Sequence, residues 1–229
     1  IFVKMGTDES SKKWAKKEIA VYRFLQKHNY PHSPQLLSTN DAEDAFAIEA
    51  YTPANGWDWN KNWSESRIEI TIQAINDLAA LKLDETELNL FSENNLSQKD
   101  NGWQQLVDYP KRQEHLFLKL KASGQENIIP QLDFLKSADI STKYHFKDDK
   151  LVHYDIRADN CAWNNNKQEV KIVDWNWAQL GDQDIDYAGL FTSIQASGFS
   201  LPKKILNQVN PAAFHWLAGF WFNSASQPI

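Results

Sequence analysis

Apolar residues recur at two different spacings along the chain, and near the N-terminus they predict a small sheet and one helix. In the helix, from about Ser11 to His28, apolar residues return every three or four positions, which is typical of an amphipathic helix. The acidic turn Asn40–Asp44 separates two of the β-prone segments, so we expect them to pair in one small sheet. The three β-prone segments are 1–4, 35–38 and 45–50.

Further along the chain the helical spacing dominates and predicts a larger, mainly helical region. Residues 84–108 are polar and rich in asparagine, so we expect loop there with short helices at most. Proline and glycine in Thr52–Gly56 signal a change of direction, which suggests two lobes made of residues 1–55 and 56–229. The expected helices are Arg67–Leu83, Val107–Ala122, Gln125–Ala138, Tyr187–Ile194 and Pro211–Phe222, and Lys143–Phe146 is a short β-prone segment.

Two short runs near residue 165 predict a β-hairpin. Cys161–Trp163 and Val170–Val173 are apolar or β-prone, and the polar residues 164–167 between them have turn chemistry. Asn160 stands just before the first strand and Asp174 just after the second. Antiparallel pairing would bring these two residues to about 5 Å from each other.

The polar residues around this hairpin indicate a site for phosphoryl transfer. A carboxylate and an amide oxygen, from Asp174 and Asn160, are hard ligands that suit Mg²⁺, which completes its shell with water and phosphate. Asp155 lies five residues before Asn160 and can return to the same pocket, where it is left for an acceptor molecule. Any one of these residues alone is more often a cap or a turn residue; their order and spacing together favour the site.

The motif also resembles a known family. H-x-D-x-x-x-x-N at His153–Asn160, followed fourteen residues later by the Asp174 of I-V-D-W, is similar to the catalytic and metal-binding loops of the protein-kinase-like superfamily. HYDIRADN and VDWNWAQLGDQDIDYAGL most resemble the aminoglycoside phosphotransferase and choline kinase type of small-molecule kinase. The resemblance implies an α+β, two-lobed fold with a small β-sheet-plus-helix lobe and a larger helical lobe. The family normally has two more strands and a phosphate-covering loop in the part that would precede Ile1, and whether this protein has them stays open.

The same resemblance implies roles for residues outside the hairpin. Lys4 would contact the phosphates of ATP and be held by Glu18, although a surface lysine and a solvated glutamate remain the alternative. Adenine would bind to backbone groups near Glu49 and Tyr51, with ATP and GTP both open as the nucleotide.

Within the motif, Asp155 would orient or deprotonate the acceptor hydroxyl, and Asn160 and Asp174 would hold Mg²⁺ on the phosphates. Arg157 would meet charge on the transferring phosphoryl group, or pair with Asp159 instead. The resemblance gives supporting structural roles to His153, Asp182 and Asp186.

Three tryptophans follow the expected change of direction. Trp57, Trp59 and Trp63 either form the floor of an acceptor pocket or pack in the core, and packing is the commoner use of tryptophan.

Composition narrows the class of partner. The net charge is −6 and the longest basic runs are pairs of lysines, which disfavours nucleic acid. One cysteine, Cys161, excludes an intrachain disulfide and favours a reducing, cytoplasmic setting. No apolar run approaches eighteen residues, so we expect no membrane span. The oligomeric state stays open.

The sequence thus predicts an ATP- and Mg²⁺-dependent phosphotransferase acting on a small hydroxylated molecule: an aminoglycoside, choline, a sugar, an amino alcohol or a nucleoside. Protein-kinase activity is disfavoured because Asp174-Trp175-Asn176 replaces D-F-G and no A-P-E follows. One alternative is a catalytically degenerate nucleotide-binding protein of kinase fold. Another is a metal-dependent hydrolase, which the lack of a His/Cys/carboxylate cluster disfavours.

Overall fold

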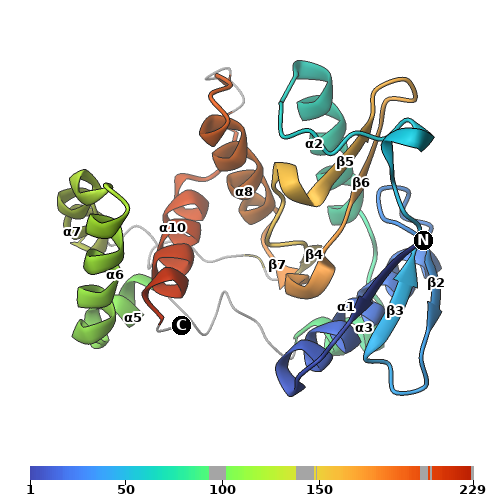
Figure 1. Ribbon diagram of the computed structural model, residues 1–229, viewed down its shortest axis with the longest axis horizontal. Coiled ribbons are helices and arrows are strands. Elements are labelled where there is room, and N and C mark those ends of the chain that lie inside the picture. The colour runs from blue at the N-terminus through green and yellow to red at the C-terminus, as the bar shows by residue number, and fades with distance from the viewer. Residues whose placement is uncertain (93–101, 138–146, 148, 202–205, 207, 228–229) are drawn as a thin grey trace.

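The N-terminal part is a three-stranded antiparallel sheet with one helix packed against it (Figure 1). The sheet has the order β1 (Phe2–Met5), β3 (Ala45–Ile48) and β2 (Leu36–Thr39). In the β1–β3 register Lys4, on the edge strand β1, lies opposite Phe46 of the central strand β3. This is a computed structural model, and it describes residues 1–92, 102–137, 147, 149–201, 206 and 208–227.

The helix on this sheet, α1 (Glu9–Lys27), has a well-defined start and one buried face. Asp8 caps it: the Asp8 carboxylate accepts from the Ser11 backbone N–H, and the Ser11 hydroxyl accepts from the Asp8 backbone N–H. Apolar residues from Ala15 to Leu25 are buried against the sheet and the rest of the core. Glu18 is buried among them, with 1% of its surface exposed, so this carboxylate needs a partner.

The remainder of the chain is mainly helical and carries two further small sheets (Figure 1). These are antiparallel pairs of β4 (Lys150–Val152) with β7 (Gln179–Gly181) and of β5 (Cys161–Asn164) with β6 (Glu169–Ile172). The helices are α2 (Glu65–Ala79), α3 (Glu85–Ser92), α5 (Gly102–Asp108), α6 (Pro110–Ala122), α7 (Ile129–Ser137), α8 (Gln183–Ala196) and α10 (Pro211–Ser226). Short 3₁₀ turns include η1 (Pro53–Asn55), η2 (Glu126–Ile128), η4 (Ala158–Asn160) and η5 (Trp175–Trp177).

The α+β class predicted from the sequence is confirmed, and the helices differ from the expected ones at several points. The helix expected from Gln125 begins with the turn η2 and is α-helical only from Ile129, and the one expected to reach Leu83 ends at Ala79. A single helix over Val107–Ala122 is wrong: α5 ends at Asp108 and α6 begins at Pro110, because proline lacks an N–H and suits only the first turn of a helix. The helix expected from Tyr187 begins earlier, at Gln183, because Asp182 caps it. The β-prone Lys143–Phe146 lies outside the described residues, and the division at residue 55 stays a prediction.

Two apolar clusters hold the described elements together. The larger one contains the buried faces of α1, α2 and α8 with all four strands β4–β7. The smaller one forms where α5, α6 and α7 pack beside α10, around Trp103, Leu106, Leu116 and Leu132 (Figure 1). Helix α10 therefore joins the α5–α7 group to the rest of the protein.

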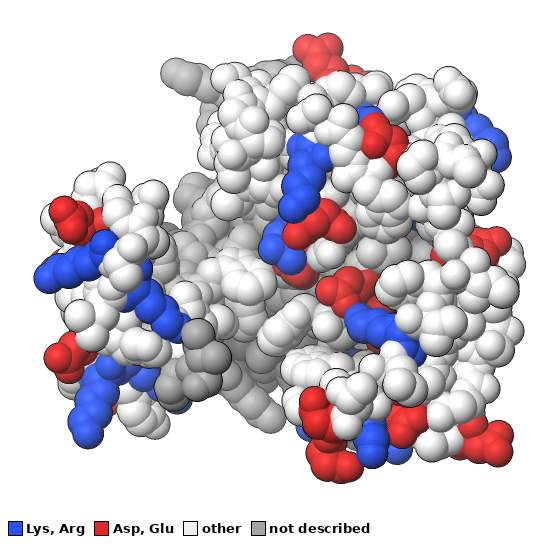
Figure 2. Space-filling model, viewed as in Figure 1, with Lys and Arg blue, Asp and Glu red and all other residues white. Residues whose placement is uncertain are grey.

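Acidic and basic side chains are interspersed on the face shown in Figure 2. The described residues on that face form no broad field of one sign. Among the described helices, none combines the length and the apolar character that crossing a membrane requires.

Two glycines allow α5 and α10 to touch. A Cβ at Gly219 would lie 2.6 Å from the indole of Trp103, and a Cβ at Gly102 would lie 2.1 Å from the carbonyl oxygen of Gly219. Both distances are far below van der Waals contact, so neither position accommodates a side chain unless the helices move apart.

We therefore expect Gly219→Ala to lower the free energy of unfolding by about 1–3 kcal/mol, as overpacked core substitutions do. Urea denaturation measures this. The control is Gly189→Ala in α8, where the new Cβ would meet only ordinary contacts at 3.5 Å. That variant should be neutral or gain up to about 1 kcal/mol from helix propensity. Equal effects of the two substitutions would contradict the close α5–α10 contact.

Candidate functional site

The β5–β6 hairpin brings the two ends of the predicted motif together. Cys161 pairs with Ile172, so Asn160 and Val173 are the next opposed residues. The backbone N–H of Val173 donates to the carbonyl of Asn160 at 3.0 Å. Asp174 is thus one residue beyond the partner of Asn160, which is the neighbourhood that the sequence predicts.

Asp174 lies between strand β6 and the turn η5 and adopts an unusual backbone conformation. Its φ of 66° and ψ of 55° lie in the left-handed region, which non-glycine residues seldom occupy. Such positions persist only where the surroundings fix them, and they concentrate at functional sites.

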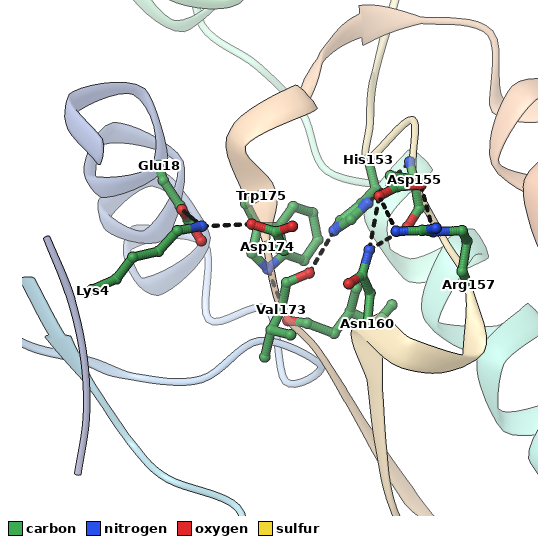
Figure 3. A network of polar contacts seen from close by, with 10 residues as sticks. Lys4, Glu18, His153, Asp155, Arg157, Asn160, Val173, Asp174 and Trp175 are labelled. Carbon is green, nitrogen blue, oxygen red and sulfur yellow. Dashed lines mark hydrogen bonds and ion pairs between the residues drawn. The ribbon is translucent and has the colours of Figure 1, made fainter. Parts of the chain in front are cut away.

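A lysine from the N-terminal sheet connects two carboxylates (Figure 3). The Nζ of Lys4 lies 2.6 Å from Oε2 of Glu18 and 2.5 Å from Oδ1 of Asp174. Burial opposes the charge of Lys4, but the two carboxylates outweigh burial and raise the pKa of Lys4 above its usual range. The lysine is therefore a firmly charged cation, and the Lys4–Glu18 contact suggested by the resemblance is present.

Asp155 belongs to a second cluster of polar side chains, on the side of Val173 away from Lys4 (Figure 3). Its carboxylate is 4% exposed, with Oδ1 at 2.8 Å from Nε of Arg157 and Oδ2 accepting from Nη2 of Arg157 at 3.1 Å. The side-chain amide of Asn160 donates to the Oδ2 of Asp155 at 3.0 Å. Burial raises the pKa of Asp155 to about 6, although Arg157 and Asn160 favour the ionised form.

Arg157 therefore has a partner that the sequence did not indicate. Of the two alternatives left open, pairing with Asp159 is present but longer, at 3.5 Å. Arg157 makes its shorter contacts with Asp155, which lies two residues before it in a loop that folds back on itself. Contact of Arg157 with a phosphoryl group stays a prediction.

His153 is a neutral connector between the two groups. Burial lowers the pKa of His153 to about 4, so its ring is uncharged at neutral pH. Its Nε2 lies 3.0 Å from the carbonyl oxygen of Val173, which only accepts, so Nε2 carries the hydrogen. Its Nδ1 then accepts from the backbone N–H of Asp155 at 3.2 Å. His153 thus supports the loop, which matches its interpretation from the sequence.

The loop that carries Asp155 is anchored by a buried carboxylate on α8. Oδ2 of Asp186 accepts from the backbone N–H of His153 at 2.9 Å, and Oδ1 accepts from that of Tyr154 at 2.8 Å. Tyr154 has a φ of 68°, so the chain turns sharply there and aims both N–H groups at one side chain. Burial raises the pKa of Asp186 to about 7, while the two N–H donors oppose this shift.

Two cavities are lined by residues of this site. The first, of about 620 Å³, is called the Lys4 cavity here and is lined by all six residues predicted to bind the nucleotide. These are Lys4, Glu18, Glu49, Tyr51, Asn160 and Asp174. The second, of about 610 Å³, is called the Asp155 cavity and is lined by Asp155, Arg157 and one side each of α8 and α10.

The sequence did not single out the helical side of the Asp155 cavity. Thr192 and Ser193 of α8 and Phe214, Leu217 and Trp221 of α10 line it. Apolar helices give no sequence signal that separates a cavity wall from a core.

Of the three tryptophans near residue 60, two pack in the core and one lines the Lys4 cavity, which is neither the core nor the expected acceptor pocket. Trp59 lines the Lys4 cavity, and its indole N–H donates to the carbonyl of Tyr51 at 2.6 Å. Trp57 and Trp63 are buried, and Trp63 packs edge-on against Trp163. None of the three lines the Asp155 cavity, so the described structure does not support an acceptor pocket floored by them.

The ligand set for a metal fits magnesium better than zinc. The described residues contain no group of three or more His, Cys, Asp or Glu side chains placed to hold a metal ion. The amide nitrogen of Asn160 is used by Asp155, which leaves its oxygen for another partner, and Asp174 already accepts one cation, the Lys4 ammonium. One carboxylate with one amide oxygen suits Mg²⁺ bound together with phosphate.

Comparison with known proteins identifies the fold. No protein-family model and no curated protein matches the sequence. A solved aminoglycoside 2'-phosphotransferase-IIIa in complex with GDP is 17% identical with a TM-score of 0.59, over 98% of this chain and 77% of that one. ADP-bound aminoglycoside phosphotransferase APH(2'')-Ib is 17% identical with a TM-score of 0.52, over 98% and 74%.

A choline kinase from Streptococcus pneumoniae is 12% identical with a TM-score of 0.50, over 95% of this chain and 66% of that one. These likenesses show that the chain has the protein-kinase-like fold of aminoglycoside phosphotransferases and choline kinases, as its motifs predict. The chain spans about three quarters of the length of the two phosphotransferases.

The contact between Arg157 and Asp155 predicts a measurable shift. A positive charge beside a carboxylate favours the ionised form, so Arg157→Gln should raise the pKa of Asp155 above about 6. A ¹³C NMR titration of the side-chain carboxyl measures this. Arg23→Gln removes an equal charge at a distant surface ion pair with Glu43 and should leave the titration unchanged. An unchanged or lower pKa in the Arg157 variant would show that the ion pair does not form.

Proposed function

We propose that this protein transfers a phosphoryl group from ATP to a hydroxyl group of a small molecule. The observation that carries the proposal is the hydrogen bond between Asn160 and Asp155, which joins the linings of the two cavities. Asp155 lines the Asp155 cavity, and it accepts a hydrogen bond from Asn160, which lines the Lys4 cavity. A nucleotide in the Lys4 cavity and an acceptor molecule in the Asp155 cavity would therefore meet at the carboxylate of Asp155.

The Lys4 cavity has the groups that a nucleotide requires. We propose that Lys4, held by Glu18, binds the phosphates, and that adenine lies against the backbone of Glu49–Tyr51. Residues 1–55 would then hold most of the nucleotide, and residues 56–229 the catalytic groups and the acceptor. The ADP and GDP in the solved neighbours support nucleotide use.

Asn160 and Asp174 would hold Mg²⁺ against the phosphates. Bound there, the ion would supply positive charge that neutralises the phosphate oxygens. Lys4 would also neutralise the phosphates, because its ammonium group lies between the carboxylates of Glu18 and Asp174.

We propose that Asp155 acts as the general base. With a pKa of about 6 it is mainly ionised at neutral pH, and its basicity exceeds that of an ordinary aspartate. It would accept the proton of the acceptor hydroxyl as the oxygen attacks the phosphorus atom. Arg157 would stabilise the ionised carboxylate and meet negative charge on the transferring group.

The lining of the Asp155 cavity favours an acceptor with an apolar body and little positive charge. Its described walls are largely aromatic and aliphatic, and its two acids are balanced by Arg157 and Lys61. Asp155 is in addition paired with Arg157, so few carboxylates are available to a polycation. Streptomycin and gentamicin occupy solved neighbours of this fold, and we propose that this chain prefers hydroxylated acceptors that are neutral or singly charged.

Nucleotide turnover tests the proposal. An ADP-release assay over hydroxylated metabolites should show turnover that depends on an added neutral acceptor and exceeds that with aminoglycosides. Asp155→Asn should lower this rate by about 10²–10⁴-fold with little change in ATP affinity, because general-base catalysis contributes that much. ADP formed without any acceptor would favour hydrolysis, and binding without turnover would favour the degenerate alternative.

The control for this substitution is Asp41→Asn, which makes the same change in an exposed turn of the N-terminal sheet. It should retain full activity. Full activity in the Asp155 variant would show that Asp155 is not the general base.

Lys4 and Glu18 should act as one unit. Loss of Lys4 leaves a buried carboxylate without its cation, and loss of Glu18 leaves the lysine without its anchor. Each of Lys4→Ala and Glu18→Ala should therefore lower kcat/KM strongly, and the double variant should be little worse than the more damaging single one. Steady-state kinetics of the four proteins measure this. Fully additive losses would separate the two residues.

A further inference from the structure

A third cavity lies along α1, away from the proposed catalytic groups. It has a volume of about 480 Å³ and is called the Trp14 cavity here. Residues of α1, of α3 and of the segment from η5 to β7 line it, among them Trp14, Trp177 and Gln179. None of its described lining residues lines the Lys4 or the Asp155 cavity. It is therefore a separate space.

The described walls of this cavity are positively charged. Lys13, Lys16 and Lys17 line it, and no acid is among its described lining residues. None of the three lysines has an ion-pair partner among the described residues, whereas Lys12 on the same helix pairs with Glu9. Burial, together with the charge of Lys13, lowers the pKa of Lys17 to about 8. The cavity therefore gathers positive charge that the described residues do not neutralise.

A buried amide at the same cavity lacks a partner. Gln179 is 1% exposed, and neither Oε1 nor Nε2 of its side chain has a hydrogen-bond partner among the residues that the structure describes. Its backbone is fixed in β7, opposite Val152 of β4. A buried polar group without a hydrogen bond costs about 1–3 kcal/mol, so such groups in native proteins usually have a partner. Gln179 is a second, independent sign that a polar ligand belongs here.

Apart from Ser10, the remaining walls are apolar. The rings of Trp14 and Trp177 lie with centroids 5.0 Å apart, and Phe91 closes the cavity from α3. Leu90 beside it is 50% exposed. Aromatic walls with a few placed polar groups are the usual form of a small-molecule site.

We propose that the Trp14 cavity binds a small organic anion with an aromatic or apolar body. The acidic group of the ligand, a carboxylate, phosphate or sulfonate, lies among the three lysines. Its body lies against Trp14 and Trp177, and a polar atom of the ligand satisfies Gln179. Lysines alone would attract any anion, and tryptophans alone any apolar molecule; the combination selects an amphiphilic one.

A pair of fluorescent probes tests the site. 8-Anilinonaphthalene-1-sulfonate carries the aromatic body and the anion, and N-phenyl-1-naphthylamine has the same rings without the sulfonate. We expect the sulfonate probe to bind the full chain at one saturable site, at least tenfold more tightly than the neutral probe. Lys13→Gln/Lys17→Gln should weaken the sulfonate probe at least tenfold and the neutral probe little. Equal affinities of the two probes for the unmodified protein would overturn the proposal.

The control variant is Lys12→Gln/Lys111→Gln, which makes the same change of net charge at lysines outside the cavity. It should bind the sulfonate probe as the unmodified protein does. An equal loss in both double variants would assign the binding to net charge and would also overturn the proposal. Gln179→Leu removes the amide while keeping a similar volume. It should weaken the sulfonate probe with an unchanged melting temperature or a higher one, and unchanged affinity would exclude Gln179 from the site.

Discussion

The site depends on one buried carboxylate, that of Asp186. It accepts the backbone N–H groups of His153 and Tyr154 and thereby fixes a loop whose backbone enters the left-handed region. His153, in the same loop, donates a hydrogen bond from Nε2 to the carbonyl oxygen of Val173, the residue before Asp174. One side chain of α8 thus sets the positions of both Asp155 and the end of the hairpin. Because each step is a buried hydrogen bond, no step can be lost without leaving a polar group unsatisfied.

The sequence predicted the parts of this site that depend on local rules. The hairpin follows from turn residues between two β-prone runs, and it alone brings Asn160 close to Asp174. The buried face of α1 follows from residue spacing. The pairing of Lys4 with Glu18 came from the order and type of residues shared with a known family, since no local rule joins a strand to a helix.

Other parts depend on tertiary packing, and the sequence could not provide them. The side chains of α10 that line the Asp155 cavity, such as Phe214, Leu217 and Trp221, are apolar like those that face the core. The pairing of Arg157 with Asp155 requires a loop that turns back, and that turn is fixed from a distance by Asp186. The break at Pro110 is a local signal, but the helical spacing on both sides of it concealed the break.

The contact between Gly102 and Gly219 has a consequence for the evolution of this protein. Helix α10 presents one side to α5 and another to the Asp155 cavity, so the depth of the glycine contact sets how far α10 stands from Asp155. A methyl group on either glycine would displace a wall of the cavity without replacing any residue that lines it. The shape of the Asp155 cavity can therefore change through mutations behind α10, while the residues that face the cavity stay the same.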